Sequence, residues 1–183
     1  RSVDSSRCEP SDEQKKGFNT INSPATAKNP IVVGSIVSSE DGTIAETSSY
    51  GPTDDGRIKP DLVAPGTDGN LGIWSTTTNS TTGISTSYEQ KAGTSMAAPL
   101  VGGLAALIVE QLEKKSFEFF PHTVKAILIH TAEDLDSKGP DYKTGWGLVN
   151  GKAAIDLIKD SELINQKYNM IITKFPTIIH DSL

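Results

Sequence analysis

The longest apolar stretch of the chain predicts a buried helix. Apolar and small residues occupy nearly every position from 100 to 109, with no polar face of the kind that a surface helix shows. We expect a helix over about residues 95–113, at the centre of a domain. Gly102 and Gly103 each disfavour a helix by about 1 kcal/mol relative to alanine, so we expect them to pack closely against a strand. Pro99 is expected within about the first turn, where a missing N–H costs least.

Shorter apolar runs predict strands and two more helices. Residues 31–37 are rich in β-branched side chains without strict alternation, which is typical of a parallel strand covered on both faces. Residues 44–50 and 62–64 predict shorter strands. A second helix is expected to begin near Pro121, with an apolar face made of Val124, Ile127, Leu128 and Thr131. A third, short helix is predicted over residues 151–159, and the polar residues 1–20 predict a surface loop.

Composition limits the classes of function. The chain has 183 residues, of which 36% are hydrophobic and 22% charged, enough for one core. We find no run of about 18 apolar residues that would span a bilayer, so no membrane role is expected. The net charge of −6 argues against nucleic acid as a partner. Cys8 is the only cysteine, so no disulfide can form within the chain.

Ser95 is the strongest candidate for chemistry. It lies in Gly-Thr-Ser-Met-Ala-Ala-Pro, residues 93–99, immediately before the apolar run. A serine in the first turn of a helix has its hydroxyl among backbone N–H groups that lack intrahelical partners, a suitable position for a nucleophile. The alternative is an ordinary helix N-cap, for which serine and threonine are also preferred.

The longer motif around Ser95 decides between the nucleophile and the N-cap interpretation. Residues 93–99 resemble the nucleophile motif of the subtilisin-like serine proteases, or subtilases. Three further segments resemble the same family in the same order: residues 23–35, 59–66 (Lys-Pro-Asp-Leu-Val-Ala-Pro-Gly) and 145–150 (Gly-Trp-Gly-Leu-Val-Asn). The resemblance covers about residues 17–159. It implies an α/β fold of three layers, with a mostly parallel central sheet and helices on both faces.

The resemblance also implies roles for individual residues. Ser95 would be the nucleophile, and its backbone N–H would form the oxyanion hole with help from the Thr94 hydroxyl. The substrate pocket would be formed in part by a turn made of Asn22, Ser23, Pro24 and Ala25. In the family this turn contains a cis peptide bond, for which Ser23–Pro24 is the candidate, and residues 70–92 run as a strand and a hairpin into the nucleophile helix.

Part of the family's machinery is absent from the sequence. Subtilases carry their catalytic residues in the order Asp, His, Ser, whereas His122, His130 and His180 all follow Ser95. The family's His-Gly-Thr and Ala-Gly-Asn are not present either. Asp41, Asp55 and Asp68 each precede a glycine, but in polar loops that indicate turns.

We therefore expect residues 1–160 to be the C-terminal half of a subtilase catalytic domain, and residues 161–183 to begin a following segment with β character. The acid, the base and the oxyanion asparagine would lie in an upstream part, and the isolated chain would be inactive. A halved domain would expose a core strand edge and the apolar face of the Ser95 helix. The alternative function is a pseudoprotease or protein-binding module that keeps the fold.

The expected partners are a peptide or protein substrate and the missing N-terminal half. No cofactor is expected to be required. Subtilases often bind structural calcium, but no segment has a specific ligand spacing, so no metal residues are assigned. The resemblance favours a secreted or cell-envelope location.

Overall fold

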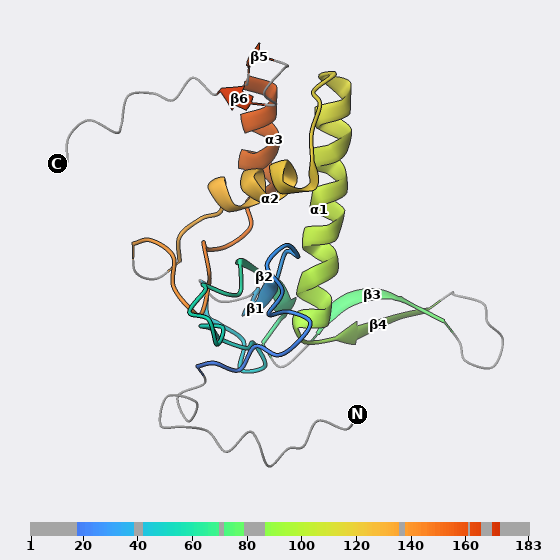
Figure 1. The fold of residues 1–183 in the computed structure, drawn as a ribbon. Helices are drawn as coiled ribbons and strands as arrows, with labels where there is room; N and C mark the ends of the chain where they lie inside the picture. Colours follow the sequence, from blue (N-terminus) through green and yellow to red (C-terminus); the bar gives the residue numbers. More distant parts are fainter. Residues whose placement is uncertain are drawn as a thin grey trace.

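Two parallel strands and one long helix form the part of the fold that carries Ser95 (Figure 1). Strand β1 (Val33–Val37) pairs with β2 (Leu62–Thr67), with Val33 opposite Leu62 and Val37 opposite Thr67. Helix α1 (Thr94–Lys114) packs against both strands. The computed structural model describes residues 18–38, 42–69, 72–78, 87–135 and 138–160, together with the backbone of residues 162–165 and 170–172.

The two strands are buried as their composition predicts. Four of the five residues of β1 are buried, and Leu62, Val63 and Ala64 of β2 have no exposed surface. The parallel pairing explains why neither strand alternates between apolar and polar residues, because both faces of such a strand are covered. Strand β2 extends to Thr67, three residues beyond the predicted end.

The prediction of a strand over residues 44–50 is wrong. Ile44 forms a single antiparallel bridge with Ile36, and the chain then turns, with the Ser48 N–H donating to the Ala45 carbonyl. The apolar residues in this stretch are too few to cover a strand, and Ser48 uses its hydroxyl to accept a hydrogen bond from the Ser35 N–H.

The core strand edge that we expected to be exposed carries hydrogen bonds from short segments. On the outer side of β1, the Val37 N–H donates to Thr43 and the Ala45 N–H to Ser35. On the outer side of β2, the Val63 N–H donates to the Gly147 carbonyl and the Val149 N–H to the Val63 carbonyl. These segments satisfy backbone groups that an open edge would leave unpaired.

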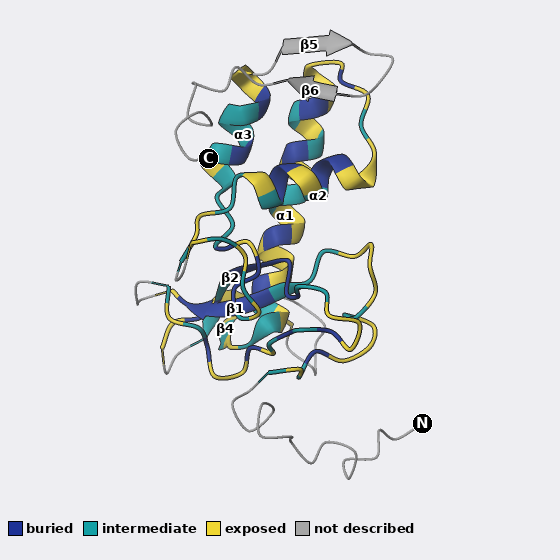
Figure 2. Cartoon of the chain, turned by 60° about the vertical axis from the view of Figure 1, so that its left-hand side comes forward, coloured by how far each residue is buried: buried dark blue, intermediate teal, exposed yellow. Residues whose placement is uncertain are grey.

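Helix α1 is buried along one face only, which corrects the expectation of a helix buried all round. Its buried residues are Ala97, Val101, Ile108 and Leu112. The other face is exposed in Figure 2, with Leu100 47% and Leu107 55% accessible. The exposure of an apolar face of α1, which we also expected, is therefore found.

The two glycines of α1 lie on its exposed face. Gly102 and Gly103 are exposed, and a Cβ atom at either position would meet nothing within 4 Å. The predicted close packing against a strand is therefore wrong, because the strands of the described residues contact the opposite face of the helix.

Pro99 lies deeper in α1 than predicted. It is the sixth residue of a helix that begins at Thr94, so its missing N–H denies the Ser95 carbonyl the hydrogen bond that residue i+4 normally supplies.

By length and composition, α1 could cross a bilayer, contrary to the expectation that no segment could. Its packing on β1 and β2 and its buried Ile108 and Leu112 also account for its apolar character as the core helix of a folded domain.

The remaining helices follow the predicted pattern. Helix α2 (Pro121–His130) buries Val124, Ile127 and Leu128, and Thr131 forms its C-cap. Helix α3 (Gly151–Asp160) buries Ala154 and Ile158. Together with α1 they form one apolar core, shown in side view in Figure 2.

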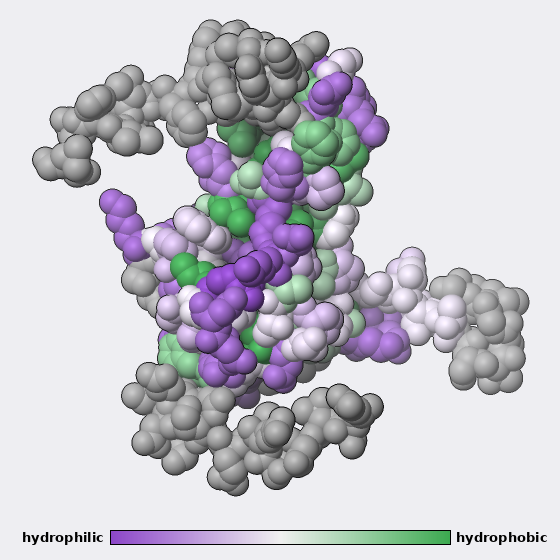
Figure 3. Space-filling model, in the orientation of Figure 1, coloured by the Kyte–Doolittle hydropathy of each residue, from purple (hydrophilic) through white to green (hydrophobic). Residues whose placement is uncertain are grey.

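Two antiparallel hairpins complete the described structure. Strands β3 (Ile73–Thr77) and β4 (Ser87–Lys91) form the predicted hairpin, which Figure 1 shows extending to one side at the N-terminal end of α1. Strands β5 (Glu162–Asn165) and β6 (Met170–Ile172) pair beyond α3. On the face shown in Figure 3, apolar side chains form several small patches among polar ones.

Candidate active site

Ser95 is exposed in the first turn of α1. The N-cap residue is Gly93, and no side chain caps the helix. The alternative in which Ser95 serves as an ordinary cap is therefore excluded by the geometry. As the second residue of the helix, Ser95 has a backbone N–H that lacks an intrahelical acceptor, and the positive end of the helix dipole favours negative charge at this point.

Glycine shapes the turn before the nucleophile. Gly93 has φ 131°, a value that residues with a Cβ atom rarely adopt. Its N–H donates to the Gly66 carbonyl at 2.8 Å, and its carbonyl accepts from the Met96 N–H at 2.9 Å. The end of β2 therefore holds the start of α1.

Gly66 is a site residue that the sequence analysis did not single out. A Cβ atom at Gly66 would lie 2.6 Å from the Gly93 carbonyl oxygen and would also collide with the Ser35 hydroxyl. Ser35 is fully buried, and its hydroxyl has no hydrogen-bond partner in the described structure. The signal was present in the sequence, since a glycine within a strand often marks close approach of another backbone, but the predicted strand ended before Gly66.

A cleft of about 460 Å³ opens beside Ser95. One wall is the N-terminal end of α1, including Met96, Pro99 and Leu100, and the other is the β3–β4 hairpin with Trp74. Trp74 is 65% exposed. The sequence analysis did not assign the hairpin residues to the site, because their approach to α1 depends on the hairpin's direction rather than on a motif.

The predicted pocket turn lies close to the start of α1. Asn22 and Ala25 line a cavity of about 130 Å³ that Thr94 also lines. Ser23 and Pro24, the other two predicted pocket residues, are exposed and are not among the residues that line this cavity. The Ser23–Pro24 peptide bond is cis, as predicted.

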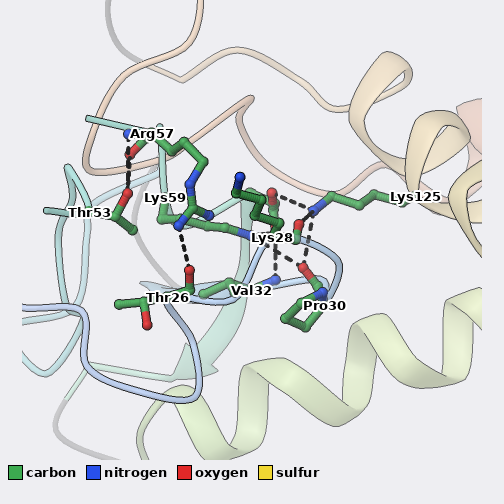
Figure 4. Close-up of polar contacts among 9 residues, drawn as sticks. Thr26, Lys28, Pro30, Val32, Thr53, Arg57, Lys59 and Lys125 are labelled. Carbon is green, nitrogen blue, oxygen red and sulfur yellow. Dashed lines mark hydrogen bonds and ion pairs between the residues drawn. The ribbon is translucent and has the colours of Figure 1, made fainter. Parts of the chain in front are cut away.

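Charged groups surround the segment that follows the pocket turn (Figure 4). The Asp61 carboxylate is 8% exposed and binds the ammonium groups of Lys59 at 2.7 Å and Lys125 at 2.9 Å. It also accepts a hydrogen bond from the Val32 N–H at 2.7 Å. The pKa of Lys59 is lowered by burial, and the neighbouring Asp61 carboxylate partly offsets this effect.

The aspartates before glycines that the structure describes have structural partners, in keeping with the turn interpretation. The Asp55 carboxylate binds the Arg57 guanidinium, and the hydrogen bonds from Arg57 and Thr53 lower its pKa to about 2. Asp68 accepts a hydrogen bond from the Ser38 hydroxyl. Asp41 lies outside the described residues.

The two histidines that the structure describes are not assembled with Ser95. His122 and His130 lie on α2, which Figure 1 shows alongside α1 and away from its N-terminal end. His122 stacks on the Phe120 ring at a centroid distance of 5.4 Å. His180 and Cys8 lie outside the described residues. Within the described ranges, no group of three histidine, cysteine or acidic residues could hold a metal ion.

Comparison with known proteins matches this geometry to one family. The model of the Subtilase family matches residues 9–147. The chain is 32% identical over 145 residues to the serine protease AprX of Bacillus subtilis, covering 74% of the chain and 32% of AprX. It is also 32% identical over 171 residues to the subtilisin-like protease SBT6.1 of Arabidopsis thaliana, covering 88% of the chain and 14% of that protein.

Solved structures of subtilisin-like proteases also resemble this chain. The CspB protease of Clostridium perfringens superposes with a TM-score of 0.65 and 30% identity, over 79% of this chain and 30% of CspB. Fervidolysin from Fervidobacterium pennivorans has a TM-score of 0.58 at the same identity, over 73% of this chain and 20% of fervidolysin. The chain thus spans about a third or less of these relatives. The folds agree, and the matched region includes the Ser95 motif, so the chain belongs to the subtilase family of serine peptidases, with an α/β fold that is incomplete in these residues.

Proposed function

We propose that this chain is the nucleophile-bearing half of a serine endopeptidase, which cleaves peptide bonds once a base and an acid are supplied by a part outside these residues. The observation that carries the proposal is Ser95, exposed in the first turn of α1 at the edge of an open cleft. Among the described residues we find no structural role, such as capping of the helix, that would account for the intact nucleophile motif.

The chemistry would proceed through an acyl-enzyme. The Ser95 oxygen attacks the carbonyl carbon of the substrate peptide bond while a histidine from the missing part accepts its proton. The proton then passes to the leaving amine as the C–N bond breaks. A water molecule next attacks the acyl-enzyme ester, releases the carboxylic acid and returns the proton to Ser95.

The oxyanion would be held by the first turn of α1. The Ser95 N–H would donate one hydrogen bond, and the family resemblance assigns a second to the hydroxyl of Thr94, the first residue of α1. The family's asparagine donor is absent from the chain. Removing one such donor lowers kcat on the order of 10²–10³-fold, so the isolated chain would lack both the base and a main electrostatic contribution.

The substrate would be a peptide or protein, with Asn22, Ser23, Pro24 and Ala25 forming part of its side-chain pocket. The cavity that joins Asn22 and Ala25 to Thr94 supports this assignment for two of the four residues.

The second partner is an N-terminal half of the domain. The exposed apolar face of α1, with Leu100 and Leu107, is the surface that such a half would cover. The proposal requires no cofactor, assigns no residues to calcium, and includes neither nucleic acid nor a membrane as partner. A secreted or cell-envelope location follows from the family resemblance alone.

Labelling with a fluorophosphonate tests the proposal, because this reagent reacts only with activated serines. The 183-residue chain alone should not be labelled. The same chain assembled with an upstream half that contains the Asp, His and Asn motifs should be labelled at Ser95 and should cleave peptides, and Ser95→Ala should abolish both. An assembled protein that binds peptides without labelling would instead be a pseudoprotease.

A further inference from the structure

We propose that Asp61, held between Lys59 and Lys125, is a positioning group that fixes the backbone of residues 26–32 and thereby the substrate-pocket turn. Lys125 would couple helix α2 to this segment. The inference rests on the proposed function for its catalytic consequence, whereas the anchoring itself is a property of the described chain.

The buried carboxylate of Asp61 has a hydrogen-bond or ion-pair donor on each of its oxygens. Asp61 Oδ2 accepts from Lys59 Nζ and from the Val32 N–H, both at 2.7 Å, and Oδ1 binds Lys125 Nζ at 2.9 Å. The side chains of Lys59 and Asp61 are 3% and 8% exposed. Three donors from three separate parts of the chain therefore meet on one anion that water scarcely reaches.

The same ammonium groups also bind the segment's carbonyls. Lys125 Nζ donates to the Pro30 carbonyl at 3.1 Å and to the Lys28 carbonyl at 3.4 Å, across more than 90 residues of sequence. Lys59 Nζ donates to the Pro30 carbonyl at 3.3 Å. A charged donor makes a stronger hydrogen bond to a carbonyl than a neutral one does.

A third cation extends the arrangement toward the pocket. Arg57 Nη2 donates to the Thr26 carbonyl at 2.7 Å. The groups held by charged side chains thus belong to every second residue of the segment, namely Thr26, Lys28, Pro30 and Val32 (Figure 4). Residues 28–30 form a bend rather than a strand, so these four contacts fix the irregular segment at separate points along its length.

The anchored segment continues directly from the pocket turn. The Ala27 N–H donates to the Pro24 carbonyl and the Ala25 N–H to the Asn22 carbonyl, so the turn and the segment are joined by hydrogen bonds. Ala25, Asn22 and Val32 line the same small cavity as Thr94. A displacement of residues 26–32 would therefore change the shape of the pocket beside the nucleophile.

Buried ion networks of this kind add little net stability, because desolvation of the charges offsets their attraction. An apolar replacement would bury the same volume without binding the carbonyls. We infer that the network serves geometry: Lys125 is anchored in α2 beside the buried Val124 and Leu128, and from there it fixes the segment.

The test uses Lys125→Met, which keeps the length of the side chain but removes its charge, and Lys125→Arg, which restores the charge. Lys152→Met is the matched control, because Lys152 forms an exposed ion pair with Asp156 on α3. In the 183-residue chain, hydrogen exchange at residues 25–32 should become about tenfold faster in Lys125→Met, since one charge-assisted hydrogen bond contributes roughly that factor. Lys125→Arg and Lys152→Met should resemble the wild type.

In the assembled enzyme, Lys125→Met should raise KM for peptide substrates about tenfold and leave kcat within about twofold, with rescue by Lys125→Arg. Unchanged exchange at residues 25–32 would overturn the anchoring. Faster exchange with kcat and KM both unchanged would overturn its role in the pocket. An assembled enzyme without activity in any variant, wild type included, would contradict the proposed function while the exchange result still decides the anchoring.

Discussion

At the scale of single residues, Asp61 is the position where one substitution should do most damage. Asp61→Asn leaves Lys59, whose side chain is 3% exposed, without its counterion. Removing one partner of a buried ion pair costs about 3–5 kcal/mol, so we expect the free energy of unfolding in denaturant to fall by that amount. Lys152→Met, at an exposed pair, should cost far less; similar losses for the two variants would contradict this prediction.

Asp55 should make a pH-dependent contribution to stability. Its pKa is lowered from 3.8 to about 2 in the folded chain, first by the hydrogen bond from Arg57. A depressed carboxyl pKa stabilises the folded state above the unfolded value, and the contribution disappears as pH falls through the folded value. The stability difference between wild type and Asp55→Asn should therefore shrink between about pH 4 and pH 2. Denaturant unfolding across this range measures it, and a constant difference would refute it.

At the scale of elements, the sequence predicted the bounds of α1 well, but it did not predict which of its faces other elements cover. Its start, apolar character and nucleophile follow from local residues, as do the buried residues of α2. Composition alone predicted a buried helix, and the exposed face of α1 was expected only because the family resemblance implied that part of the domain was missing. The prediction of a strand over residues 44–50 was wrong because neighbouring strands, rather than intrinsic propensity, decide whether a short apolar run joins a sheet.

Glycine substitutions in α1 and at its N-cap test whether the apolar face of the helix is exposed in solution. In the isolated chain, Gly103→Ala should stabilise by about 0.5–1 kcal/mol, because the helix gains propensity and the new methyl group meets nothing within 4 Å. Gly93→Ala should instead destabilise by about 1–3 kcal/mol, because its φ is 131°. Thermal unfolding of the two variants tests both signs. A loss of stability for Gly103→Ala would mean that the exposed face is already covered in solution.

At the scale of the whole molecule, the site is divided between what local motifs specify and what only the tertiary structure brings together. Ser95 and the cis Ser23–Pro24 turn could be predicted from motifs. The contact between Gly66 and Gly93, and the approach of Lys125 to residues 28–30, join segments far apart in the sequence. No periodicity encodes such contacts, since they depend on how α2 and the strands pack around a shared core.

The exposed face of α1 should also govern how the isolated chain behaves in solution. Leu100 and Leu107 are 47% and 55% exposed, and exposed apolar patches promote self-association. Because association stabilises the folded state by mass action, a tenfold increase in concentration should raise the Tm by about 2–4 °C. Calorimetry over that range tests this. The double substitution of Leu100 and Leu107 by serine should remove the dependence, and Tyr142→Ser, at an exposed ring elsewhere, should keep it. A sharp Tm independent of concentration in the wild type would show that α1 needs no partner, and the case for a missing half would then rest on the absent catalytic residues alone.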